Sequence, residues 1–133
     1  MLFRSELGAV VHQPADGPVS QTTGHGVVLA PRYDGIIMDP PSYGRGPGGE
    51  IWKLEDNVYD LITLTEQVLS DKPLFFAINS YTEGLSPAVM EYIVKTTLCP
   101  VKGGHTHCDE IGLPVSSTGG VVPCGATAIW EEN

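Results

Sequence analysis

Basic side chains are scarce in this sequence. Its 133 residues carry seven Lys and Arg against 16 Asp and Glu, which gives a formal net charge of −9. Proteins that hold nucleic acid by its phosphates are usually basic, because the phosphates must be neutralised. A chain this acidic repels a polyanion over much of its surface. Contact with RNA would therefore need a local basic patch or a part of the protein outside this sequence.

Cysteine is also rare. Cys99, Cys108 and Cys124 form an odd, scattered set, which is not the framework of a disulfide-linked secreted domain. No run reaches the roughly 18 apolar residues of a membrane-spanning helix. Residues 1–11 are too short and broken an apolar stretch for a signal peptide. These absences predict a cytoplasmic protein without membrane contact.

The composition that remains is that of a globular protein. Hydrophobic residues make up 41% of the chain and charged residues 17%, which predicts one domain or part of a larger one. The pattern changes near residue 32. Residues 1–31 show no regular period except at Val27-Val28-Leu29, and we predict an irregular leader there, truncated or non-native. Residues 32–133 carry the regular pattern of a folded domain.

From Arg32 onward the pattern predicts the order strand, helix, strand, helix, strand, strand. The apolar run Tyr33–Met38 predicts a buried strand that ends at Asp39-Pro40-Pro41, because proline cannot donate to a strand ladder. A glycine-rich loop, Ser42–Glu50, follows. Asp56 or Asn57 is the expected cap of the first helix, which Asp71-Lys72-Pro73 breaks. Its apolar face comprises Val58, Leu61, Ile62, Val68 and Leu69.

The second half of the pattern begins with Leu74–Ile78, a predicted buried strand. Ser86 and Pro87 are typical of a helix cap and first helical position, and Pro100 is expected to end that helix. Two further strands are predicted at residues 106–113 and 121–130, joined by a glycine-containing turn into an antiparallel pair. The first two strands and the helix between them predict a right-handed parallel βαβ unit.

Polar groups follow both predicted central strands. Asp39 to Tyr43 comes after the first strand, and Asn79-Ser80-Tyr81 comes after the second. Ligands of open α/β sheets bind at the carboxyl ends of the strands. A flat ligand such as a nucleobase could stack on Tyr43 while polar groups read its edge. The alternative is structural: the prolines end a strand, and Asp39 accepts backbone hydrogen bonds.

The segment Asp34–Glu55, DGIIMDPPSYGRGPGGEIWKLE, resembles class I S-adenosylmethionine-dependent methyltransferases. It is most similar to the branch related to bacterial large-subunit ribosomal RNA methyltransferases. The similarity continues through residues 79–87, 110–119 and 123–127. It implies an α/β, Rossmann-like methyltransferase fold, with residues 32–133 as the C-terminal half of the catalytic domain. The predicted first strand then corresponds to the family's fourth, and the N-terminal strands are missing.

The resemblance also implies an activity. We expect methyl transfer from S-adenosyl-L-methionine to an acceptor of the nucleobase type, with ribosomal RNA as the expected substrate. By resemblance, Asp39 and the Pro40 carbonyl hold the acceptor amine and adjoin the cofactor, and Tyr43 stacks on the base. The residues expected to bind substrate beside them are Pro41, Ser42, Arg45, Asn79 and Ser80. For Arg45 the alternative is a solvated loop charge.

Two departures limit that expectation. Cytosine C5 methylation needs a Cys nucleophile, and the family's two positions for it hold other residues here, so nitrogen methylation or a non-RNA acceptor is left open. Thr23-Gly24-His25-Gly26 has no strand before it and no helix after it, and so fails the context of a nucleotide-binding loop. The cofactor's glycine-rich motif is therefore not assigned.

Two alternative functions remain. One is an inactive methyltransferase fragment or interaction module, whose first strand, at residues 33–38, would be an exposed edge open to pairing. The other is a zinc-binding domain built on His105, His107 and Cys108, with Cys99 and Cys124 nearby. Strand alternation would point the two histidines to one face and Cys108 to the other. No metal site is assigned from the sequence.

Overall fold

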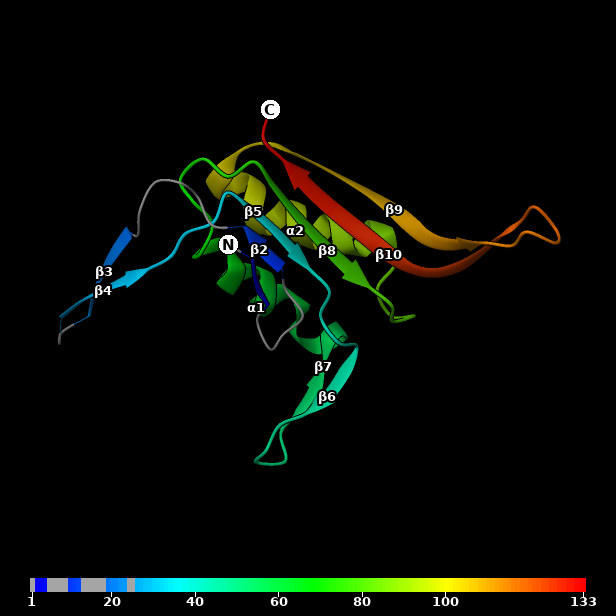
Figure 1. Cartoon of the computed structure of the whole chain (residues 1–133), viewed down its shortest axis with the longest axis horizontal. Coiled ribbons are helices and arrows are strands. Elements are labelled where there is room, and N and C mark those ends of the chain that lie inside the picture. The colour runs from blue at the N-terminus through cyan, green and yellow to red at the C-terminus, as the bar shows by residue number, and fades with distance from the viewer. Residues whose placement is uncertain (1, 5–9, 13–18, 24–25) are drawn as a thin grey trace.

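The computed structural model describes residues 2–4, 10–12, 19–23 and 26–133. A six-stranded sheet has the spatial order β1-β2-β5-β8-β10-β9 (Figure 1). Its strands are β1 (Leu2–Arg4), β2 (Val10–His12), β5 (Gly35–Met38), β8 (Phe75–Ser80), β9 (His105–Pro114) and β10 (Val121–Glu131). The helices are α1 (Leu54–Glu66) and α2 (Pro87–Lys102), and two small hairpins pair β3 (Val19–Thr23) with β4 (Gly26–Ala30) and β6 (Tyr43–Arg45) with β7 (Ile51–Lys53).

The predicted fold class is confirmed. β5 and β8, which precede and follow α1 in the sequence, pair directly in parallel. β9 and β10 form the predicted antiparallel pair. β10 is inserted between β8 and β9 and runs antiparallel to both. The result is an α/β sheet of the Rossmann-like type with a terminal antiparallel pair.

The core lies between one face of this sheet and both helices, which lie behind the sheet in Figure 1. Side chains alternate along β8, where Phe76, Ile78 and Ser80 are buried and their neighbours half-buried. The same alternation buries Ile36 and Met38 on β5 and leaves Ile37 exposed. The other face of β5, β8 and β10 is consequently more open to solvent.

The N-terminal part differs from the sequence reading. The structure describes strands β1 to β4 within residues 1–31, where only Val27–Leu29 showed a strand pattern. These strands are short, so they lack the run of alternating residues from which a strand is read. Gly24 and His25 lie outside the described residues. A domain boundary near residue 32 stays a prediction.

The expectation that the first strand of the main unit is an exposed edge is wrong. β2 pairs antiparallel with β5, with Val10 opposite Ile37, so the backbone of β5 is paired on both sides. The edges of the described sheet are β1 and β9. The long-range pairing of β2 leaves no signal in the local sequence pattern.

Some helix boundaries also differ. The residue at the N-cap of α1 is Lys53 and not Asp56 or Asn57, because β7 runs directly into the helix, and no side chain caps it. Asn57 lies inside the helix and donates from Nδ2 to the Lys53 carbonyl at 2.7 Å. Pro100 lies inside α2 rather than at its end, and the Gly103 N–H donates to the Cys99 carbonyl at 2.9 Å to close the last turn. The Ser86 cap is confirmed: its hydroxyl accepts from the Val89 N–H at 3.4 Å.

No helix in the described ranges is long and apolar enough to cross a membrane.

Glu91 of α2 joins the helix to β9. Its carboxylate accepts from the Thr106 hydroxyl at 3.0 Å and from the Cys108 thiol at 3.2 Å. The Cys108 hydrogen bond, followed by that of Thr106, lowers the pKa of Glu91 below its ordinary value. The same bond, with burial as the second cause, raises the pKa of Cys108. Both shifts favour the state in which Glu91 is ionised and Cys108 protonated.

These shifts predict a pH dependence of stability. A carboxyl whose pKa is lowered by folding stabilises the fold above its unfolded pKa, about 4.3, and this contribution is lost as pH falls through the folded pKa. The unfolding free energy lost in Cys108→Ala should therefore be smaller at pH 3.5 than at pH 7, as measured by urea unfolding. Cys124→Ala, which alters a half-buried cysteine of β10, is the control and should lose the same free energy at both pH values. Equal losses at both pH values for Cys108→Ala would contradict the assignment.

The raised pKa of the Cys108 thiol affects stability at alkaline pH. A thiol whose pKa is raised by folding stabilises the fold fully below its unfolded pKa, about 8.5, and this contribution is lost as pH rises through the folded pKa.

Candidate functional site

The bend after β5 is fixed and accessible. Asp39 and Pro41 are exposed, and Pro40 between them is buried. The Trp52 indole Nε1 donates to the Pro41 carbonyl at 2.9 Å, and the Leu54 N–H donates to the Ser42 carbonyl at 3.0 Å. These bonds attach the bend to β7 and the start of α1. The two prolines restrict the backbone further, so the Asp39 carboxylate is presented from a rigid corner of the sheet.

The end of β8 lies next to this corner. β5 and β8 are parallel and in register, with Met38 opposite Ile78, so both strands end at the same edge. Burial is the main cause that raises the pKa of Tyr81, and the nearby carboxylate of Asp39 and then the thiol of Cys124 raise it further. Asp39 and Tyr81 are therefore electrostatic neighbours, as expected for groups at one edge of a parallel sheet.

Tyr81 is held against β10 by a glycine. A Cβ on Gly125 would lie 2.8 Å from the Tyr81 ring carbon Cδ1 and 2.5 Å from the Ser80 carbonyl oxygen. Only a residue without a side chain lets the ring and the strand approach this closely. Tyr81 is nevertheless 49% exposed, so part of the residue stays available to a ligand.

A hollow of about 410 Å³ opens beside Tyr81. It lies between the start of α2 and the β9–β10 hairpin. The loop after β8 that forms one wall is tied to α1 by a hydrogen bond from the Thr82 hydroxyl to the Glu55 carboxylate. The lining residues are Tyr81, Thr82, Glu83, Leu85, Ser86, Pro87, Glu110, Pro123, Cys124, Gly125 and Ala126.

The predicted site residues divide into two groups. Asp39, Pro40, Pro41 and Asn79 lie at the ends of β5 and β8 as expected. Ser80 lies there too, but its side chain is fully buried on the helix side, and its hydroxyl accepts from the Thr82 N–H at 3.4 Å. Ser80 therefore supports the loop from within and does not face a ligand.

The second group lies on the β6–β7 hairpin. The glycine-rich segment predicted as a loop is this hairpin, which projects away from the main sheet in Figure 1. Tyr43 is 51% exposed there, and Arg45 donates from Nε to the Tyr43 hydroxyl at 3.1 Å. Neither side chain lines the hollow. None of the predicted site residues at the strand ends lines the hollow either, so their ligand-binding roles and those of Tyr43, Ser42 and Arg45 stay predictions.

None of the residues that line the hollow was in the predicted site, and three of them, Tyr81, Cys124 and Glu110, carry groups that can contact a polar or flat ligand. Tyr81 carries a local signal, because it is an aromatic residue directly after a strand end. Cys124 and Glu110 carry none, because the pairing of β10 with β8 and β9 brings them to the hollow from distant positions. With these three residues, the candidate site includes the hollow as well as the bend after β5.

The chain was compared with family models, curated proteins and solved structures. No family model and no curated protein matches the chain. Among solved structures, it is similar to a SAM-dependent methyltransferase from Agrobacterium tumefaciens, with a TM-score of 0.65 and 27% identity over 77% of this chain. It also matches SMU.776, a candidate methyltransferase complexed with SAH, with a TM-score of 0.52 and 19% identity over 74% of this chain.

The chain spans only part of these proteins, 34% of the first and 26% of the second. The described chain thus has part of the fold of class I SAM-dependent methyltransferases.

Proposed function

We propose that this chain forms the acceptor side of a SAM-dependent methyltransferase that acts on a nucleobase-type substrate, with ribosomal RNA as the first candidate. The observation that carries the proposal is that the exposed Asp39 follows β5 and the half-exposed Tyr81 follows β8, at the adjoining ends of two parallel strands. The fold shared with a SAM-dependent methyltransferase supports it.

Methyl transfer requires of the protein mainly that it align the acceptor with the methyl group. Methyl transfer from a sulfonium is an in-line displacement, in which the protein orients the acceptor and its lone pair. The Asp39 carboxylate can accept a hydrogen bond from an amine N–H, and the Pro40 carbonyl next to it can accept a second. Tyr81 offers a partly exposed ring against which a base can stack. Tyr43 is a second stacking group in this proposal, carried by the β6–β7 hairpin.

The cofactor fits only in part. S-adenosylmethionine supplies the methyl group when bound, and Asp39 and Pro40 would adjoin it at the β5 corner. A glycine-rich turn between a strand and a helix, which would hold its nucleotide part, is not found in the described residues before β5, where strands alone occur. The remaining contacts would come from outside the described residues.

Asp39→Ala tests the proposal. We expect methyl transfer to fall by about 10²-fold, because a misaligned acceptor loses that order of rate. The assay follows radiolabelled methyl from S-adenosylmethionine into deproteinised ribosomal RNA, with transfer RNA and a protein mixture as other acceptors. Asp60→Ala, which removes an exposed carboxylate from α1, is the control and should keep full activity.

The opposite outcomes are informative. A complete protein that binds no S-adenosylmethionine and labels no acceptor would overturn the proposal in favour of an inactive fragment. Label in protein but not in RNA would keep the methyltransferase and reject the nucleobase acceptor.

A further inference from the structure

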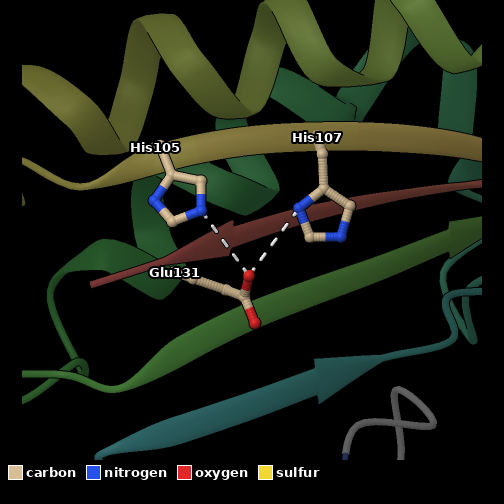
Figure 2. Close-up of side chains that lie close together, drawn as sticks. All are labelled: His105, His107 and Glu131. Carbon is tan, nitrogen blue, oxygen red and sulfur yellow. Dashed lines mark ion pairs between the residues drawn. The ribbon is translucent and has the colours of Figure 1, made fainter. Parts of the chain in front are cut away.

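Three potential metal ligands converge on the sheet face opposite the helices. His105 and His107 are alternate residues of β9, so both side chains leave the strand on the same face. The pairing of β9 with β10 sets Glu131 directly opposite His105. Figure 2 shows the two imidazole rings directed at one oxygen of the Glu131 carboxylate.

The distances are close to those of a metal centre. Glu131 Oε2 lies 3.7 Å from His105 Nε2 and 3.8 Å from His107 Nδ1, and all three ligand atoms lie within 4.8 Å of one another. Two donors on a tetrahedral zinc ion lie about 3.4 Å apart, given metal–ligand distances near 2.1 Å. The three side chains are about half exposed, so small side-chain rotations suffice to close the remaining gap.

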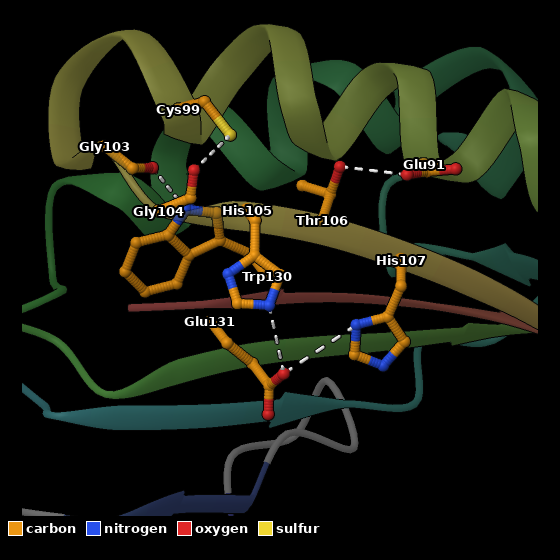
Figure 3. A network of polar contacts seen from close by, with 9 residues as sticks. All are labelled: Glu91, Cys99, Gly103, Gly104, His105, Thr106, His107, Trp130 and Glu131. Carbon is orange, nitrogen blue, oxygen red and sulfur yellow. Dashed lines mark hydrogen bonds and ion pairs between the residues drawn. The ribbon is translucent and has the colours of Figure 1, made fainter. Parts of the chain in front are cut away.

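The backbone that carries these ligands is held from the other face. Trp130, next to Glu131, is fully buried and donates from Nε1 to the Gly103 carbonyl at 2.7 Å, at the turn that leads into β9. Thr106, between the two histidines, donates to Glu91 of α2. Figure 3 shows this network behind the histidines. The backbone positions of the three ligands are therefore set by the fold before any metal binds, which lowers the cost of ordering them.

This set differs from the cysteine-containing one that the sequence suggested. Cys108 donates to Glu91 on the helix side, and the Cys99 thiol lies against the Gly104 carbonyl at 3.9 Å, so neither joins the histidines. Figure 3 shows Cys99 on the α2 side of the β9 strand. The predicted alternation of His105 and His107 against Cys108 is confirmed. The carboxylate of Glu131 takes the place of the thiols.

We propose that His105, His107 and Glu131 form a zinc-binding site on the open face of the sheet. Two imidazoles and one carboxylate are a donor set that zinc accepts, and three protein ligands leave a fourth position for water or another ligand. Magnesium prefers oxygen ligands and should not bind two imidazoles. The site is separate from the Asp39 corner, and its function does not depend on methyl transfer.

Isothermal titration of ZnCl₂ into the 133-residue chain at pH 7.5 tests this site, with MgCl₂ as the comparison ion. We expect one zinc per chain. His105→Ala, His107→Ala and Glu131→Gln should each weaken binding at least tenfold, because each removes one of three ligands. The paired variant His12→Ala/His25→Ala removes two imidazoles elsewhere and should bind zinc as the unaltered chain does. Circular dichroism of each variant is measured to check that it is folded.

A second measurement identifies the ligand atoms. Cobalt(II) bound in place of zinc should give visible absorption bands without the thiolate charge-transfer band that a cysteine ligand produces. That band, or zinc binding that survives His105→Ala/His107→Ala, would overturn the proposal. Loss of binding in His12→Ala/His25→Ala alone would place the metal elsewhere and would overturn it too.

Discussion

Replacing Trp130 with alanine should lower the free energy of unfolding by about 3–5 kcal/mol, the range for large-to-small changes at buried aromatic residues. The Trp130 side chain is fully buried between β10 and α2. Its loss leaves a cavity in the core and removes the hydrogen bond from Nε1 to the Gly103 carbonyl. Urea unfolding followed by far-ultraviolet circular dichroism measures the difference.

Tyr92→Ala is the matched control for that prediction. Tyr92 lies on α2 and is 69% exposed, and a surface substitution usually changes stability by no more than about 0.5 kcal/mol. A loss below about 1 kcal/mol in Trp130→Ala would show that this residue is not part of a close-packed core, and would weaken the rigid support argued for Glu131.

The second large effect is expected at Gly104, where β9 begins. Its φ of +73° lies in the left-handed region, which costs an L residue about 1–2 kcal/mol. An added Cβ would also lie 2.7 Å from Trp130 Nε1 and closer still to the Glu131 carbonyl oxygen. Both neighbours are fixed, so Gly104→Ala should lose about 3 kcal/mol or more once the overlap is added.

Gly119→Ala separates these two causes. Gly119 has a φ of +68° in the β9–β10 turn, and a Cβ there would meet no atom within 4 Å. It should lose only the conformational part, about 1–2 kcal/mol. Urea unfolding of both variants measures the difference, and equal losses would show that the close approach of Gly104 to Trp130 is absent in solution.

The elements that were predicted correctly are those with a local cause. The Ser86-Pro87 start of α2 was read from two residues, because a cap acts on the backbone N–H groups directly after it. The buried strands β5 and β8 were read from short apolar runs bounded by prolines and polar residues. The position of Asp39 at a strand end followed from the prolines that stop β5.

Three features of the chain differ from the sequence-based prediction. The β6–β7 hairpin contains mostly glycine, proline and polar residues, so its strands lack the apolar alternation that marks a strand. Pro100 was expected to end α2, yet the hydrogen bond from Gly103 to Cys99 continues the last turn. The side chain of Ser80 was expected to face a ligand, but the register of β8 turns it into the core.

What the sequence by itself determined is the order of the two helices and of the four sheet strands β5, β8, β9 and β10, the methyltransferase resemblance, and the carboxylate that follows β5. Hydrophobic period, helix caps and prolines act over a few residues, so they can be read along the chain. Only the tertiary structure decided that Tyr81 and Cys124 border one hollow and that Glu131 meets His105 and His107. Those neighbours are set by strand register, which depends on burial across the whole sheet and leaves no local trace.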